Sequence, residues 1–351
     1  MRGHCPVAYS PYLGWSLFRH QDIQRVLHDH ETFSNVVSTH PAVPNGMDPP
    51  LHTHYRRLLD PYFSATEMER FEPVCREIAA TCLRSLPGQG EVDFCESFAE
   101  PFALSVQCAF TGWPGEVKER LRQWLKNQQK ATLAGDREAT ARLAGEFEDC
   151  VRGILAARRL QPQADLTTRL LQETLSETEI ISILRNWTVG ELGTIAAAVG
   201  ILVHYLCVHR EVQSRLRRQP AELAPAIEEI LRLEAPLLSN RRLVKQATQI
   251  GQHRLEAGDR VTLMWASGNR DETVFPDSAS FRPERDQEQN LLYGSGIHAC
   301  PGAPLARLEL RVALQCLLEG TRELELSQQR EPVRATYPAA GFASLPIVVK
   351  A

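Results

Sequence analysis

Apolar residues recur at spacings of three and four through five long segments of the chain, and this periodicity restricts the fold more than any other feature. Such spacing places apolar side chains on one face of a helix. The segments are residues 66–86, 115–159, 177–217, 221–234 and 303–319. Short strand patterns lie toward both ends of the chain, in YLGWSLF, RLVKQAT, DRVTLMWA and SLPIVVK. We therefore expect a mainly α fold with small β-sheets, formed by residues 1–351 as one domain.

Composition and charge exclude several classes of protein. The 351 residues carry a formal net charge of −4, so no basic field indicates binding to nucleic acid or to a membrane surface. The nine cysteines are an odd number without a C-x-x-C pair, which favours a reducing compartment. No signal peptide is recognisable, and the most apolar stretch, residues 194–207, is too short to span a bilayer. We expect a cytoplasmic monomer.

The stretch GSGIHACPG, residues 294–302, places one cysteine in permissive backbone. Its glycines allow positive φ angles or the close approach of a ligand. The thiol of Cys300 comes just before a predicted helix, whose positive end favours the thiolate. A thiolate on a loop that admits a broad, flat ligand suits axial ligation of a haem iron.

Two other interpretations of this cysteine are open on the residues alone. Inert buried cysteines are common, so Cys300 could be one more small core residue. Zinc is disfavoured, because His298 and Cys300 supply only two ligands and no second pair is spaced to complete a tetrahedron.

The longer stretch YGSGIHACPGAPLAR resembles the haem-binding signature of the cytochrome P450 family, in which a Phe-Gly-x-Gly-x-His-x-Cys-x-Gly loop holds the proximal thiolate. Tyr293 replaces the usual phenylalanine. The matching residues are Gly294, Gly296, His298, Cys300, Gly302, Leu305, Ala306 and Arg307. The resemblance implies a haem b cofactor with Cys300 as its iron ligand and Gly302 beside it.

The sequence EEILR places Glu229 and Arg232 on one helix face. By spacing alone, these residues would be a solvated surface pair worth about half a kcal/mol or less. The P450 family has the same Glu-x-x-Arg motif, joined by an arginine from a later loop. The resemblance assigns that place to Arg285 and gives all three a structural role.

Haem carries two propionates, which need cationic partners. In DPPLHTHYRRLL, His52 and Arg56 are four residues apart and share a helix face. The segment resembles a family helix that contacts the haem, as Arg242 resembles an arginine that reaches the haem edge from a strand. Arg241 is the alternative if the register slips by one residue. His298 is a further candidate contact.

The segment NWTVGELGTIAAAVG covers the distal side of the site that the resemblance implies. Thr194 takes the position of the family's catalytic threonine, and Gly193 takes that of the acid before it. Glu191 lies three residues before Thr194 and shares its helix face. Thr194 could instead bond to its own helix, and Glu191 could pair with a cation, relay protons to Thr194 or hold a substrate.

The resemblance also indicates which residues line the substrate pocket. They are Asn186, Val189, Gly190, Leu237, Leu238, Asn240 and Phe342. Such a pocket is apolar with two amides and suits a small or medium hydrophobic molecule with a polar handle. Several of these residues could equally pack the core.

Taken together, the resemblance implies a haem-thiolate monooxygenase that inserts one oxygen atom from O2 into an organic substrate. No Gly-x-Gly-x-x-Gly nucleotide motif occurs, so we expect electrons from a separate ferredoxin and ferredoxin reductase. A peroxide-driven peroxygenase is the first alternative, although such relatives lose the threonine and show an arginine–proline pair. A non-catalytic haem- or ligand-binding protein is the second, favoured only by Gly193.

Overall fold

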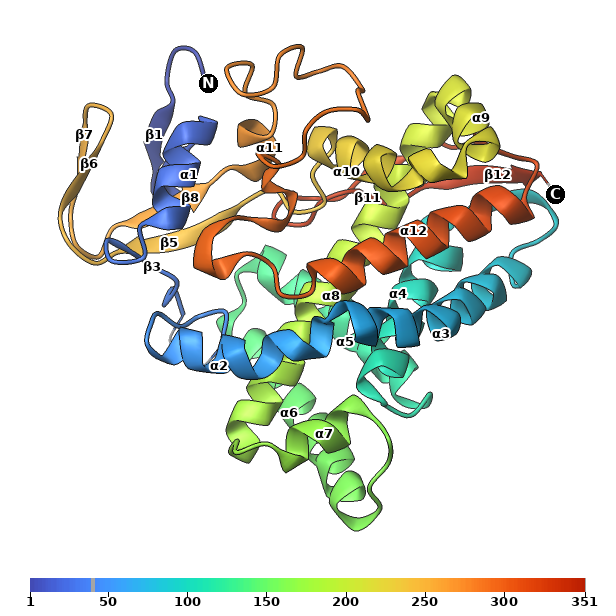
Figure 1. The fold of residues 1–351 in the computed structure, drawn as a ribbon, viewed down its shortest axis with the longest axis horizontal. Helices are drawn as coiled ribbons and strands as arrows, with labels where there is room; N and C mark the ends of the chain where they lie inside the picture. The colour runs from blue at the N-terminus through green and yellow to red at the C-terminus, as the bar shows by residue number, and fades with distance from the viewer. Residues whose placement is uncertain (39–41, 351) are drawn as a thin grey trace.

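The computed structural model describes residues 1–38 and 42–350. Its helices dominate, as the apolar periodicity predicts (Figure 1). They are α1 (His20–His28), α2 (Leu51–Leu59), α3 (Ala65–Arg84), α4 (Glu100–Thr111), α5 (Val117–Ala134), α6 (Arg137–Leu160), α7 (Leu166–Gln172), α8 (Glu177–Val208), α9 (Arg210–Arg218), α10 (Leu223–Leu233), α11 (Trp265–Gly268) and α12 (Ala303–Gly320).

The strands form small sheets from segments far apart in sequence. They are β1 (Val7–Ser10), β2 (Gly14–Leu17), β3 (Phe33–Ser34), β4 (Gln89–Asp93), β5 (Asn240–Val244), β6 (Thr248–Ile250), β7 (His253–Leu255), β8 (Arg260–Leu263), β9 (Glu323–Leu326), β10 (Val333–Arg334), β11 (Phe342–Ser344) and β12 (Pro346–Lys350). The largest sheet has the order β1-β2-β8-β5-β3, and a second has the order β4-β12-β9. The first sheet joins the N-terminal strands to β5 and β8, and the second joins β4 to the C-terminal strands β9 and β12.

Two of the long periodic segments are each divided into two helices. The segment 115–159 is interrupted at Gly135, whose φ of 65° ends α5 in the left-handed region. Asp136 then starts α6 by accepting a hydrogen bond from the backbone N–H of Ala139 at 2.9 Å. The segment 177–217 is divided at His209, between α8 and α9. Periodicity alone does not show such breaks, because both helices continue the same apolar spacing.

Helix α8 crosses the middle of the molecule and packs on α4, α10 and α12 (Figure 1). It begins with a capping box between Ser176 and Glu179. The apolar stretch 194–207 lies in the second half of α8, which has 32 residues. By length and composition this helix could cross a membrane, but 56% of its most apolar window is buried in the protein, as in the core helix of a globular fold.

Helix α12 follows the Cys300 loop and lies between α3 and α8. Its apolar residues face both neighbours and include Leu305, Leu308, Val312 and Leu317, all buried. In Figure 1, α12 runs in orange over the central α8, with α3 in blue beneath it. This packing holds the loop before α12 against the middle of α8, where the candidate site lies.

Candidate functional site

A cavity of about 570 Å³ separates the middle of α8 from the loop before α12. Most of its wall comes from residues within 27–56, 186–198, 236–242 and 292–310. These segments are far apart in sequence and meet only in the folded chain. The cavity is large enough to hold a small organic molecule or part of a larger one.

Cys300 stands at the end of a loop that folds back on itself. Its backbone N–H donates to the carbonyl of Tyr293 at 2.8 Å. Gly294 and Gly296 both have a φ of 70°. A Cβ atom at Gly296 would collide with the backbone carbonyl of Leu27 in α1. Glycine is therefore needed at 296, as the motif predicts, because the loop packs directly on the end of α1.

The Cys300 thiol opens into the cavity, although protein encloses it on the other sides. Burial raises the pKa of this thiol above its ordinary value. The backbone N–H of Gly302, the charge of Arg56 and the backbone N–H of Ala303 act in the opposite direction. A metal ion would favour the thiolate further, because it is the thiolate that coordinates metals.

Basic side chains gather in the wall of the same cavity. The rings of His52 in α2 and His298 in the loop lie 4.1 Å apart, centroid to centroid. Arg56 of α2 donates to the loop carbonyls of Ile297 at 3.1 Å and Ala299 at 2.9 Å. Helix α2 and the Cys300 loop are thus tied together, as the predicted shared site requires.

Several of these basic groups lack partners within the described residues. His52 Nδ1 and His298 Nε2 are buried without a hydrogen bond. Arg242 is 3% exposed, and its one hydrogen bond among the described residues goes to the carbonyl of Arg241 at 2.7 Å. Burial lowers the pKa of Arg242 to about 10. Unpaired buried polar groups cost about 1–3 kcal/mol each. A ligand that hydrogen-bonds the two histidines and offsets the charge of Arg242 would remove this cost, and the carboxylates of a haem fit.

Glu229, Arg232 and Arg285 form the predicted network. Both oxygens of Glu229 accept from Arg232 at 2.8 Å, and Oε1 also accepts from Arg285 at 3.1 Å. Arg232 further donates to the carbonyls of Asn269 at 2.6 Å and Ser278 at 3.0 Å. Glu229 and Arg232 are both fully buried. The network joins α10 to the segment before the Cys300 loop and does not line the cavity.

Thr194 lines the cavity from α8, and its hydroxyl donates to the carbonyl of Gly190 in its own helix. This is the back-bonded state common for threonine in helices. Gly193 has no heavy atom within 4 Å of a Cβ atom built on it. A side chain would therefore fit at 193, and its absence is not caused by crowding.

Glu191 also lines the cavity, but its carboxyl group faces Glu309 of α12. The ion pairs between described residues include neither glutamate, so the expected pairing of Glu191 with a cation is not found there. Glu309 is a site residue that the sequence analysis missed. The available signal was a glutamate between Leu308 and Leu310 on the buried face of an amphipathic helix.

Most of the predicted substrate residues reach the cavity. Its lining includes Asn186, Val189, Gly190, Leu237 and Asn240. Asn186 also donates its side-chain N–H to the carbonyl of Val43 at 3.0 Å. The remaining two residues do not line the cavity. Leu238 is half-buried outside the cavity lining, and the ring of Phe342 is buried against His204, with 4.5 Å between ring centroids. Phe342 begins β11 and Leu238 comes just before β5, and only the fold determines the direction of these segments.

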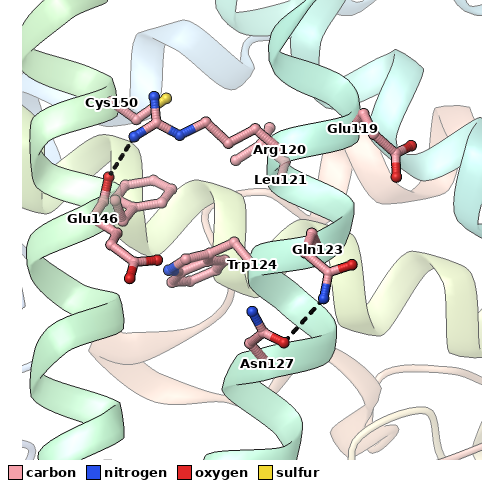
Figure 2. A pocket seen from close by; sticks show the side chains of 9 residues that line it. Glu119, Arg120, Leu121, Gln123, Trp124, Asn127, Glu146 and Cys150 are labelled. Carbon is pink, nitrogen blue, oxygen red and sulfur yellow. Dashed lines mark hydrogen bonds between the residues drawn. The ribbon is translucent and has the colours of Figure 1, made fainter.

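A second pocket, of about 400 Å³, lies between α5 and α6 (Figure 2). The indole of Trp124 forms its floor and donates to the carbonyl of Leu143 at 2.8 Å. Arg120 spans its rim and donates to the backbone carbonyl of Glu146 at 3.4 Å. It shares no lining residue with the larger cavity.

Comparisons with protein families and with known sequences find the same family. The family described as Cytochrome P450 matches residues 222–350. Cytochrome P450 109 of Bacillus spizizenii is 30% identical over 95% of this chain and 86% of its own length. Cyclomarin C epoxidase CymV of Salinispora arenicola is 30% identical over 100% of this chain and 94% of its own.

A solved structure extends the likeness to three dimensions. The P450 CYP109B1 from Bacillus subtilis superposes with a TM-score of 0.89 at 29% identity and covers 99% of this chain and 96% of its own. The mainly α fold with small sheets is thus the P450 fold. Relatives of this similarity and coverage establish the family, its haem b cofactor and its reaction class. The chain therefore belongs to the cytochrome P450 family and is a haem-thiolate monooxygenase.

Proposed function

We propose that Cys300 is the proximal ligand of the haem iron and that His52, Arg56, Arg242 and His298 bind the haem propionates. One observation carries this assignment: the Cys300 thiol opens into the same cavity as the unpaired nitrogens of the two histidines and the buried guanidinium of Arg242. Gly302, also in the cavity wall, lets the cofactor approach the backbone.

When bound, the haem supplies the activation of dioxygen, and the surrounding chain supplies positioning and protons. Thr194 would leave its bond to the Gly190 carbonyl and turn its hydroxyl toward the cavity, where it would hold a water. Glu191, one helical turn earlier, is the nearest acid of α8 in the cavity wall.

The substrate that suits this cavity is a small or medium hydrophobic molecule with a polar handle. Val189 and Leu237 supply apolar contact, and Asn240 offers an amide from the start of β5. Asn186 donates its side-chain N–H to Val43, and Asn240 Oδ1 accepts from the backbone N–H of Arg241 at 2.7 Å, so Asn186 would offer substrate its amide oxygen and Asn240 its amide N–H.

We infer that residues 1–351 act as one haem domain in the cytoplasm, as a monomer. Electrons would come from a separate ferredoxin and its reductase, because these 351 residues contain no nucleotide-binding glycine motif. Turnover with a surrogate ferredoxin pair, compared with turnover with peroxide alone, tests this source of electrons. Product formed only with peroxide would contradict it.

Replacing Cys300 with serine tests the proximal ligand. The reduced, carbon-monoxide-bound protein should show the long-wavelength Soret band of thiolate-ligated haem, and Cys300→Ser should lose it, because an alcohol does not replace the thiolate. Cys316→Ser on α12 is the matched control and should keep the band. A Cys300→Ser protein that binds haem with an unchanged spectrum would show that another residue is the ligand.

A further inference from the structure

Three oxidisable aromatic side chains line the haem cavity, and one of them continues toward the surface. The three are Trp187 of α8, Trp265 and Tyr293. Among the described residues, only Trp187 has a ring contact with a further tyrosine or tryptophan, since its indole lies 6.0 Å from the ring of Tyr62, centroid to centroid. Tryptophan and tyrosine are the aromatic side chains that lose an electron most readily. Trp187 and Tyr62 therefore form a stepwise path by which an electron can enter the cavity.

Tyr62 connects this path to a carboxylate nearer the surface. It lies in the short 3-10 helix Asp60–Phe63 that follows α2, and only 3% of it is exposed. Its hydroxyl donates to Oε1 of Glu173 at 3.1 Å. Glu173 follows α7 and is partly exposed. The phenol is thus buried between a tryptophan of the cavity wall and a proton acceptor that solvent can reach.

The charges around Tyr62 require that its electron and its proton leave together. The guanidinium of Arg169 lies over the ring, 4.5 Å from its centroid, and is held there by an ion pair with Glu67 at 3.1 Å. A cation in that place opposes a positive charge on the ring. Burial and the charge of Glu173 raise the pKa of Tyr62 above its ordinary value, so the phenol is protonated at rest. Oxidation of Tyr62 must therefore transfer its proton, and Glu173 is in position to accept it.

We propose that Trp187 and Tyr62 carry an oxidising equivalent out of the haem cavity when no substrate consumes it. Trp187 gives one electron to the cofactor, and Tyr62 gives one electron to the oxidised indole. As Tyr62 is oxidised, its O–H bond breaks and a new O–H bond forms on the Glu173 carboxylate. A one-electron reductant in solution, such as ascorbate, then reduces the phenoxyl radical, and the proton returns from Glu173. The oxidant comes from the monooxygenase reaction, so the path protects the cavity from that reaction.

Other rings in the same cluster serve packing alone. Phe63 packs against Trp187, with 5.3 Å between ring centroids, and stacks on Phe110 at 5.6 Å. Phenyl rings fill space, but they give up an electron far less readily than indole or phenol. Phenylalanine in place of Trp187 or Tyr62 keeps an aromatic ring in the cluster and removes only the group that is oxidised. Both substitutions therefore test electron transfer with little change of packing.

Freeze-quenched electron paramagnetic resonance of the haem-loaded protein tests the path. Mixed with hydrogen peroxide in the absence of substrate, the wild type should give a tyrosyl radical signal that narrows when its tyrosines carry ring deuterium. Tyr62→Phe should lose the signal because the donor is gone, and Trp187→Phe because the step to the donor is broken. Glu173→Gln should lose it too, because an amide does not accept the phenol proton. An unchanged tyrosyl signal in Tyr62→Phe or in Trp187→Phe would overturn the proposal.

Tyr55→Phe is the matched control. Tyr55 is also buried and donates to a carboxylate, that of Glu179, but its ring contact among the described residues is with His54 and not with a tryptophan. The control should keep the wild-type signal. Absence of a tyrosyl signal in the wild type, or its loss in Tyr55→Phe alone, would contradict the path through Trp187.

Loss of haem absorbance under peroxide tests the protective role. With ascorbate present, Tyr62→Phe and Trp187→Phe should lose the Soret band faster than the wild type and Tyr55→Phe. Equal rates in all four proteins would contradict protection. A wild type without the long-wavelength carbon-monoxide band would contradict the assignment of Cys300 and leave the radical test valid, because that test requires bound haem and peroxide and not a particular ligand.

Discussion

Glu191 and Glu309 have raised pKa values because they are buried, and not because of the type of side chain. An exposed glutamate is ionised at neutral pH. These two lie in the interface of α8 and α12, where desolvation is the largest cause of their raised pKa values. Their burial beside the cavity therefore favours the uncharged form of both carboxyl groups.

The raised pKa of Glu191 predicts a pH-dependent stability. Its pKa rises from 4.5 in the unfolded chain to about 7 in the fold. The folded state then binds the proton more tightly than the unfolded chain. The resulting contribution to the free energy of unfolding is complete below pH 4.5 and is lost as pH rises through about 7. With about 1.4 kcal/mol for each pKa unit, the loss should reach a few kcal/mol.

Urea unfolding between acid and neutral pH measures this dependence. The difference in free energy of unfolding between wild type and Glu191→Gln should change across that range, because glutamine does not titrate. Glu319→Gln should follow the wild type at every pH. A constant offset between Glu191→Gln and wild type would mean that Glu191 has an ordinary pKa in the fold.

At the scale of elements, α10 is joined to the segment before the Cys300 loop by a buried ionic network. Burial alone would raise the pKa of Glu229, but the side chain of Arg232, the backbone N–H of Arg282 and the side chain of Arg285 hold it below its ordinary value. Arg232 also donates hydrogen bonds to the backbone carbonyls of Asn269 and Ser278. The network fixes the path of an irregular segment that has few backbone hydrogen bonds of its own.

Removing one member of this network should be costly. Arg232→Leu leaves the Glu229 carboxylate buried without its main partner, so the free energy of unfolding should fall by about 3–5 kcal/mol. Chemical denaturation measures the loss. Arg254→Ala removes an ion pair with Glu256 whose side chains are 76% and 61% exposed, and should cost less than about 1 kcal/mol. A similar loss of unfolding free energy in both variants would contradict the structural role of the network.

At the scale of the whole molecule, the cavity exists because segments distant in sequence converge on it. The four residues that would hold the propionates come from three places: His52 and Arg56 from α2, Arg242 from β5 and His298 from the Cys300 loop. The largest sheet positions β5 between β8 and β3, and the packing of α12 on α3 and α8 positions the loop. A bound haem should therefore bridge parts of the chain that local folding does not connect.

The rate at which haem is lost measures how strongly these distant residues hold it. Arg242→Ala should lose haem to apomyoglobin about 10- to 100-fold faster than the wild type, because a charge-assisted hydrogen bond is worth about 1.5–3 kcal/mol. Arg241→Ala is the matched neighbour and should have the smaller effect, since Arg241 is partly exposed and Arg242 is buried. The reverse order would mean that Arg241 is the residue that contacts the haem.

Sequence alone determined the fold class, the family and the position of the candidate ligand. The predicted helical periodicity is found in α3, α8, α10 and α12. Helix α3 keeps one face exposed, whereas α8 is buried on several sides in the core. The glycines around Cys300 could be predicted because positive φ is a local backbone demand, whereas the close approach of Gly296 to Leu27 of α1 is a tertiary contact. The Glu229 motif needed the resemblance, since spacing alone predicted a solvated pair.

Only the tertiary structure decided which side chains meet. Glu191 was predicted to pair with a cation, relay protons to Thr194 or hold a substrate, and its carboxyl group faces Glu309, 118 positions later in the chain. Phe342 and Leu238 were predicted in the pocket and lie outside its lining. Local pattern specifies which face of a helix or strand is apolar, but it carries no information about which distant element that face packs against. That choice depends on long-range packing, and the protonation of a buried acid follows from it.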